Sequence, residues 1–261
     1  PNDIPTQQYA CEVLGNLCHG NAKNREMIRQ QEGIDCIITA MRNHPNDADV
    51  QHQSCAALRN LAYENATNRK EIATKGAVEL ILQAMSNHPG AYIVQYQACG
   101  ALANLAYEKE NGNQLEQKRS IPLIQAAMVN YPGQLEVQHQ ALLMYWNLLV
   151  IHDVGNNDAV RLIAEQNGIS LIVIAMRNHP NDGDVQELAS DVLGLLTDKN
   201  EGNRASVVHH GGIEALVAAM RKDSNKDKLK QKACRVLSNL AENNYEYRMR
   251  ITESGGIETI V

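Results

Sequence analysis

Six cysteines and nine histidines are the side chains of this chain best suited to metal or redox chemistry. A metal site needs several ligands around one ion, and a disulfide needs two cysteines with Cα atoms within about 7 Å. Cys11, Cys55 and Cys99 instead recur at one regular interval, and regular spacing of this kind is typical of equivalent positions in separate repeats. We therefore expect no metal site and six free cysteines that act as small core residues in a reducing compartment. They are Cys11, Cys18, Cys36, Cys55, Cys99 and Cys234.

Other patterns that support catalysis are not found in the sequence. It contains no nucleophile elbow, no phosphate-binding glycine loop and no zinc signature, and its acidic residues are scattered. His44, His88 and His179 recur in one short turn, so we expect them to contact the turn backbone or the turn of the next unit. The sequence predicts a protein that is not an enzyme and needs no cofactor.

Internal repetition is the dominant feature of the chain. The octet AMRNHPND occurs at Ala40–Asp47 and again at Ala175–Asp182. A second series of Leu-x-Asn-Leu-like segments keeps the same interval. The methionines of the first series are spaced 44, 43, 48 and 44 residues apart: Met41, Met85, Met128, Met176 and Met220. The leucines that end the second series are Leu17, Leu61, Leu105, Leu148, Leu196 and Leu240. A period of this length predicts a helical solenoid.

Each repeat unit has the pattern of three helices. A short helix begins at an Asn-Arg pair, and a second helix shows the apolar spacing of Ile34, Ile37, Ile38 and Met41 before it stops near proline. The third helix is the longest, with Asp47 or Asp49 as its N-cap in one unit. We expect a glycine with positive φ to end each first helix. These glycines are Gly33, Gly76, Gly168, Gly212 and Gly256.

This order of helices resembles the armadillo repeat, and the segments Ala57–Ala62 and Ala101–Ala106 carry its A-L-x-N-L-A motif. The resemblance implies an all-α fold, a right-handed α-solenoid superhelix of three-helix repeats. We expect residues 1–261 to form a single array cut within a repeat at both ends. The approximate units are 1–44, 45–88, 89–131, 132–179, 180–223 and 224–261.

In the armadillo family the third helices line a concave groove, and asparagines there hydrogen-bond the main chain of an extended peptide. We call the five matching residues of this chain the repeat asparagines. They are Asn16, Asn60, Asn104, Asn147 and Asn239. An amide both donates and accepts, which suits a peptide unit. The alternative is that these amides bond neighbouring helices of the scaffold.

Further groove residues are expected beside the repeat asparagines. They are Arg59, Tyr63, Tyr107, Glu64 and Glu108. Trp146, with Leu143, Val150 and Ile151, interrupts the pattern of the fourth unit, and extra residues follow at Val154–Asn157. Our hypothesis is an apolar anchor site with Trp146 as its hot spot, flanked by Tyr63 and Tyr107. The alternative is that Trp146 packs in the core.

Charge restricts the class of partner. The net charge of −6 argues against general binding to nucleic acid or to membrane surfaces, and no run of about 18 apolar residues occurs. The position four residues before each repeat asparagine lacks the tryptophan of nuclear-import adaptors. The sequence therefore predicts a non-enzymatic interaction scaffold that binds a protein or peptide of basic or mixed charge, as an extended segment or a helix.

Two further expectations follow. The alternative function is a regulatory or structural arm of a larger, multidomain protein that packs against its own other domains. We expect the chain in the cytoplasm, with the nucleus as the alternative. The sequence does not indicate an oligomeric state.

Overall fold

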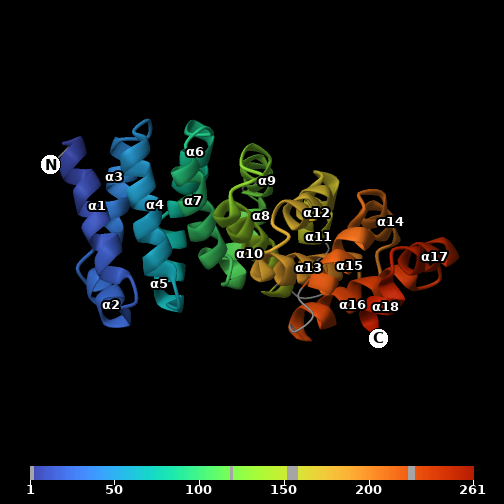
Figure 1. Cartoon of the computed structure of the whole chain (residues 1–261). Helices are drawn as coiled ribbons and strands as arrows, with labels where there is room; N and C mark the ends of the chain where they lie inside the picture. Colours follow the sequence, from blue (N-terminus) through green and yellow to red (C-terminus); the bar gives the residue numbers. More distant parts are fainter. Residues whose placement is uncertain (1–2, 118–119, 152–157, 223–226) are drawn as a thin grey trace. The chain divides into compact units, whose positions relative to one another are not determined.

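The computed structural model describes residues 3–117, 120–151, 158–222 and 227–261, and every regular element in these ranges is an α-helix (Figure 1). The first helices of the repeats are α2 (Ala22–Gln30), α5 (Ala66–Thr74), α8 (Lys109–Gln117), α11 (Asp158–Glu165), α14 (Glu201–His209) and α17 (Tyr245–Glu253). The second helices are α3 (Gly33–Asn43), α6 (Ala77–Asn87), α9 (Ser120–Asn130), α12 (Gly168–Asn178), α15 (Gly212–Lys222) and α18 (Gly256–Ile260). The third helices are α1 (Ile4–Cys18), α4 (Ala48–Ala62), α7 (Tyr92–Leu105), α10 (Leu135–Ile151), α13 (Gly183–Thr197) and α16 (Asp227–Ala241). The chain is an all-α solenoid, as predicted.

The helices gather into two compact units. The first holds Pro1–Asn130 with Val150–Asp153, and the second holds Tyr131–Leu149 with Val154–Val261. Within the first unit α1, α4 and α7 pack side by side as a row of third helices, and in the second α13 packs against α16 (Figure 1). The boundary at Asn130 falls beside the predicted end of the third repeat at residue 131. The single array over 1–261 stays a prediction.

The core repeats from helix to helix, as the apolar spacing predicts. Ile34, Ile37, Ile38 and Met41 are all buried, which confirms the predicted face of α3. The tight contacts between helices suit Ala, Leu, Ile, Val and Cys, and these types fill the buried positions. Each repeat therefore depends on its neighbours for a closed hydrophobic interface.

Asparagines and aspartates fix where the helices begin. Asp47 caps α4 by accepting from the Val50 amide at 2.9 Å, which resolves the choice between Asp47 and Asp49. The prediction that first helices begin at the Asn-Arg pair is wrong by two residues: Asn65 caps α5, accepting from the Asn68 amide at 2.9 Å, and the helix begins at Ala66. The same cap occurs at Asn21, Asn200 and Asn244.

The asparagine of the Asn-Arg pair has a different role. Asn68 is completely buried, and its Nδ2 donates to the Leu61 carbonyl at 2.9 Å and to the Arg25 carbonyl at 3.4 Å. It thus gives a hydrogen bond to a free carbonyl at the end of the third helix α4, and it joins the first helices α2 and α5. Asn24, Asn111 and Asn203 bond the ends of their own preceding third helices in the same way.

The glycine prediction holds at one position and is wrong at four. Gly76 has a φ of 81°, as expected. Gly33, Gly168, Gly212 and Gly256 are instead the first residues of second helices, and the positive φ belongs to the residue before each. Those residues are Glu32, Asn167, Gly211 and Gly255. The reason for glycine at Gly212 is space, since a Cβ there would lie 2.4 Å from Val207 Cγ1 and 2.9 Å from the Val207 carbonyl oxygen.

A buried glutamine closes the turn between the second and third helices in three repeats of the described chain. Gln51 Nε2 donates to the carbonyls of Met41 at 3.0 Å and His44 at 2.9 Å. Gln95 and Gln186 make the same pair of bonds in their own repeats. The sequence carries this signal as a recurring Val-Gln dipeptide, which our sequence reasoning missed.

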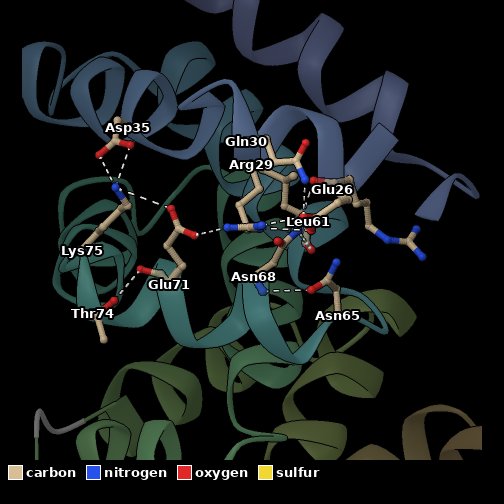
Figure 2. Close-up of polar contacts among 11 residues, drawn as sticks. Glu26, Arg29, Gln30, Asp35, Leu61, Asn65, Asn68, Glu71, Thr74 and Lys75 are labelled. Carbon is tan, nitrogen blue, oxygen red and sulfur yellow. Dashed lines mark hydrogen bonds and ion pairs between the residues drawn. The ribbon is translucent and has the colours of Figure 1, made fainter. Parts of the chain in front are cut away.

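Polar contacts also join successive repeats. His88 Nε2 contacts the Pro45 carbonyl at 3.0 Å, and His179 Nε2 contacts the Pro132 carbonyl at 3.2 Å. These two histidines therefore contact the backbone of a turn, as expected, but it is the turn of the preceding repeat and not of the next one. On the opposite side of the first unit Arg29 pairs with Glu71 at 3.3 Å and Lys75 with Asp35 at 2.7 Å, a network drawn in Figure 2. These partly exposed pairs set the register between repeats more than they add stability.

All six cysteines are free, but not all are core residues. Cys11, Cys18, Cys55 and Cys99 are buried, whereas Cys234 is half-buried and Cys36 is exposed. The prediction of six core cysteines is therefore wrong at these last two. Cys36 lines an open hollow between α1 and α3, where no other helix of the described chain covers it.

Thiol reactivity should follow this division. Burial raises the pKa of Cys18 to about 11 and those of Cys55 and Cys99 to about 12, so these three thiols stay protonated at neutral pH. We expect a maleimide at pH 7 to label Cys36 first, then Cys234, and to leave the buried thiols unlabelled until urea unfolds the chain. Rapid native labelling of Cys55, located by peptide mass mapping, would contradict the described packing of α4.

Candidate ligand groove

The row of third helices in the first unit holds a hollow of about 650 Å³. Side chains from α1, α4 and α7 form its floor, because these helices pack side by side with the same face outward. Five of the predicted groove residues line it: Asn16, Asn60, Asn104, Arg59 and Tyr63. The hollow is polar and aromatic, and its dimensions suit a chain segment better than an enclosed small molecule.

The repeat asparagines use their amide donors inside the scaffold. Asn60 Nδ2 donates to the Gly15 carbonyl at 3.0 Å, Asn104 Nδ2 to the Arg59 carbonyl at 2.9 Å, and Asn239 Nδ2 to the Gly194 carbonyl at 3.2 Å. These bonds join adjacent third helices, as in the alternative hypothesis that the asparagine amides bond neighbouring helices of the scaffold. No described residue donates to the Oδ1 of Asn60 or Asn104, so this oxygen can accept an N–H from a bound main chain.

The other two repeat asparagines differ in exposure. Asn16 is exposed on α1 and lines the hollow. Asn147 on α10 is only 3% exposed and therefore presents almost no surface to a ligand. Leu195 occupies the corresponding place in α13.

Arginines from the first helices reach the tyrosines that follow the third helices. The guanidinium carbon of Arg69 lies 5.0 Å from the centre of the Tyr107 ring, and that of Arg25 lies 5.8 Å from the Tyr63 ring. Arg59 lies 4.7 Å from the ring of Tyr96. Arg25, Arg69 and Tyr96 were missed by sequence reasoning, although the Asn-Arg pair marks the two arginines.

Three acidic residues on or directly after the third helices pair with basic residues of the chain itself. Glu108 pairs with Arg69 at 2.6 Å, and Glu242 pairs with Arg204 at 2.6 Å. Asp191 accepts from Lys232 at 2.9 Å and from Arg235 at 2.8 Å, and it also receives the Trp146 indole. Glu64 is exposed, with a φ of 48°. The charges of Glu108, Asp191 and Glu242 are therefore paired within the scaffold.

Trp146 belongs to the second unit. Its indole Nε1 donates to Asp191 Oδ2 at 3.0 Å, and its ring is half-buried. Val154–Asn157 and the side chain of Ile151 lie outside the described residues. The anchor site around Trp146, with Tyr63 and Tyr107 beside it, stays a prediction.

The described residues give no sign of a metal site or of a single membrane-spanning helix. Among residues 3–117, 120–151, 158–222 and 227–261, no three His, Cys, Asp or Glu side chains gather as metal ligands. In the same ranges no single helix is long and apolar enough to cross a membrane, although the bent pair α11 and α12 meets the length and composition together. Ile169, Ile172 and Val173 of that pair are buried within the protein.

Two segments of the chain match models of known protein families. Residues 200–242 match the family model of the Armadillo/beta-catenin-like repeat, and residues 6–88 match that of the spinocerebellar ataxia type 10 protein domain. No curated protein matches the sequence of the chain.

Solved structures share the fold at low sequence identity. A designed armadillo repeat protein is 18% identical, with a TM-score of 0.72 over 89% of this chain and 92% of its own. A chain from a structure on the phosphorylation switch between cadherin and beta-catenin is 17% identical, with a TM-score of 0.79 over 97% of this chain and 45% of its own. A designed armadillo repeat protein in complex with the peptide (KR)4 is 17% identical, with a TM-score of 0.63 over 91% of this chain and 99% of its own.

The chain therefore holds one segment that matches the armadillo repeat model, and it shares its fold with armadillo repeat proteins.

Proposed function

We propose that this chain is a non-enzymatic scaffold that holds an extended peptide or a helix of a partner protein along its third helices. The observation that carries the proposal is the open hollow over α1, α4 and α7, where the side-chain amide oxygens (Oδ1) of Asn60 and Asn104 have no donor among the described residues. An extended main chain supplies an N–H at regular intervals, which matches acceptors placed on successive helices.

The mixed charge of the groove restricts the charge of the peptides that we expect it to bind. The chain carries −6 overall, which favours a basic or mixed partner, but Arg69, Arg204, Lys232 and Arg235 each pair with a groove acid. These pairs support a ligand of mixed charge over a uniformly basic one. The designed protein that binds (KR)4 shares the fold at 17% identity, which makes a peptide ligand for this fold physically reasonable.

A blocking variant tests the proposal. Ala56 is half-buried on the floor of the hollow, so Ala56→Trp should fill the groove without removing a scaffold contact. We expect affinity capture of peptides from a random display library to fall at least tenfold for this variant. Lys70→Trp, an equally bulky change at an exposed position of α5, should leave capture unchanged. Equal capture by wild type and Ala56→Trp would contradict the groove proposal.

We also propose that the protein works in the cytoplasm, with the nucleus as the alternative compartment. Its six free thiols support a reducing environment. Fluorescence microscopy of the tagged chain tests this, and secretion into the medium would contradict it.

A further inference from the structure

The hollow of the first unit contains two arginines without a carboxylate partner among the described residues. Arg25 is 5% exposed, its Nη1 donates to the Cys18 carbonyl at 3.1 Å, and its buried Nε has no hydrogen-bond partner. Arg59 donates only to the neutral amide of Gln97, at 3.2 Å. Both arginines line the hollow, so both cations are held at the place where a ligand would lie.

Equivalent arginines elsewhere in the same chain do have carboxylates. Arg69 and Arg204 follow the asparagine that bonds the preceding third helix, as Arg25 follows Asn24, and they pair with Glu108 and Glu242. The chain thus shows what this arginine position binds when the scaffold supplies a partner. At Arg25 the scaffold supplies none within the described ranges, and a buried guanidinium with an unused N–H is costly.

Arg235 in the second unit makes the reverse contact to that of Arg59. Arg59, one residue before Asn60, lies against Gly100 of the next third helix, where a Cβ would approach its Nε to 2.5 Å. Arg235, four residues before Asn239, lies against Gly194 of the preceding third helix. Arg235 donates to the carboxylate of Asp191 at 2.8 Å, whereas Arg59 has Gln97 instead. The absence of a Cβ at each glycine leaves the space that the guanidinium occupies on the neighbouring helix.

The remaining groups of the hollow do not cancel this charge. Glu12 is the only carboxylate among the residues that line it, against Arg25 and Arg59. His52 also lines it, and burial lowers the pKa of its imidazole against the opposing effects of Asp49 and Glu12, so the ring is neutral at pH 7. The guanidinium carbons of Arg25 and Arg59 lie 5.8 Å from the ring centre of Tyr63 and 4.7 Å from that of Tyr96, so one face of each ring already contacts a cation of the chain.

We propose that the hollow is a subsite for an acidic side chain of the bound peptide, whose carboxylate or phosphate oxygens accept hydrogen bonds from Arg59 and Arg25. This inference rests on the proposed peptide-binding function and names the chemistry of one ligand residue. A planar guanidinium matches two oxygens of a carboxylate or phosphate, and such charge-assisted pairs are stronger than neutral ones.

Peptide mixtures with one fixed central residue test the proposal. The central residue is Glu, phosphoserine, Gln or Lys, and the flanking positions are random. We expect the Glu or phosphoserine mixture to bind about tenfold more tightly than the Gln mixture by fluorescence anisotropy. Arg59→Gln should remove most of this difference, and the ratio of Glu to phosphoserine identifies the oxyanion preferred. Lys23→Gln, the same charge change at an exposed site of α2, should keep the difference.

The outcomes separate the two proposals. Equal binding of the Gln and acidic mixtures, with both blocked by Ala56→Trp, would overturn the acidic subsite and leave the groove intact. Acid-dependent binding that survives Arg59→Gln would also overturn it. Binding that Ala56→Trp does not change would contradict the proposed function itself.

A second measurement needs no peptide. Titration with inorganic phosphate or acetate, followed by the Nε–H signals of the arginine side chains in NMR spectra, should shift Arg25 and Arg59 with saturation. Arg161, which already pairs with Asp158 and Glu165, is the control and should not shift. Identical, non-saturating shifts at all arginines would overturn the anion site.

Discussion

Replacing Gly212 by alanine should destabilise the protein by about 3 kcal/mol, the largest effect that we expect from a single added methyl group. A Cβ at this position would lie 2.4 Å from Val207 Cγ1 and 2.9 Å from the Val207 carbonyl oxygen. The side chain could rotate away, but the backbone oxygen could not, so α15 must move away from α14. Urea unfolding and hydrogen exchange of α14 and α15 measure the loss.

Gly133→Ala is the matched control in the same unit. No atom lies within 4 Å of a Cβ built at Gly133, so this change should leave stability within about 0.5 kcal/mol of wild type. A Gly212→Ala protein as stable as Gly133→Ala would show that close approach is not what this glycine provides. The same comparison applies to Gly33 and Gly256, which have equivalent contacts with Ile28 and Ile251.

Replacing Gln95 by methionine should cost about 2 kcal/mol, because it removes the donor from two carbonyls at the turn between α6 and α7. Gln95 is 3% exposed, and its Nε2 donates to Met85 at 2.9 Å and to His88 at 3.0 Å. Methionine fills the same volume but cannot donate, so the buried Met85 carbonyl loses its side-chain partner. The His88 carbonyl keeps a bond from the Ala91 amide, which limits the total loss.

Gln83→Met is the control that separates the loss of the buried Gln95 hydrogen bonds from any cost of replacing a glutamine by methionine. Gln83 is exposed on α6, where methionine should be nearly neutral in urea unfolding. Equal stability of the two variants would contradict the role of the buried glutamine in closing the turn.

The repeat and its helices could be predicted from the sequence because they depend on local pattern. The apolar spacing of Ile34, Ile37 and Met41 fixes which face of α3 is buried, and the proline after His44 fixes where the helix stops. Positive φ was harder to place. In the pair Gly211-Gly212 the first glycine adopts the positive φ, and the second leaves room for Val207. The sequence alone does not show which of the two adjacent glycines has which role.

The electrostatics of the groove could not be predicted in the same way. Whether Glu108 is available to a ligand depends on Arg69, which lies 39 residues earlier and reaches it from another helix. The Asn60 amide likewise meets the Gly15 carbonyl from the preceding third helix. Such pairings depend on how successive repeats stack. Residue type and repeat position therefore predict which residues lie along the third helices, but not which of their charges stay unpaired.

The most direct test of peptide binding by the third helices is an NMR titration of the labelled chain with a peptide selected by the capture experiment. We expect the side-chain amides of Asn60 and Asn104 and the Nε–H of Arg59 to shift together as the peptide saturates. The signals of Lys70 and Gln83, on α5 and α6, should not move. Shifts confined to the first and second helices, with Asn60, Asn104 and Arg59 unchanged, would contradict the proposed groove.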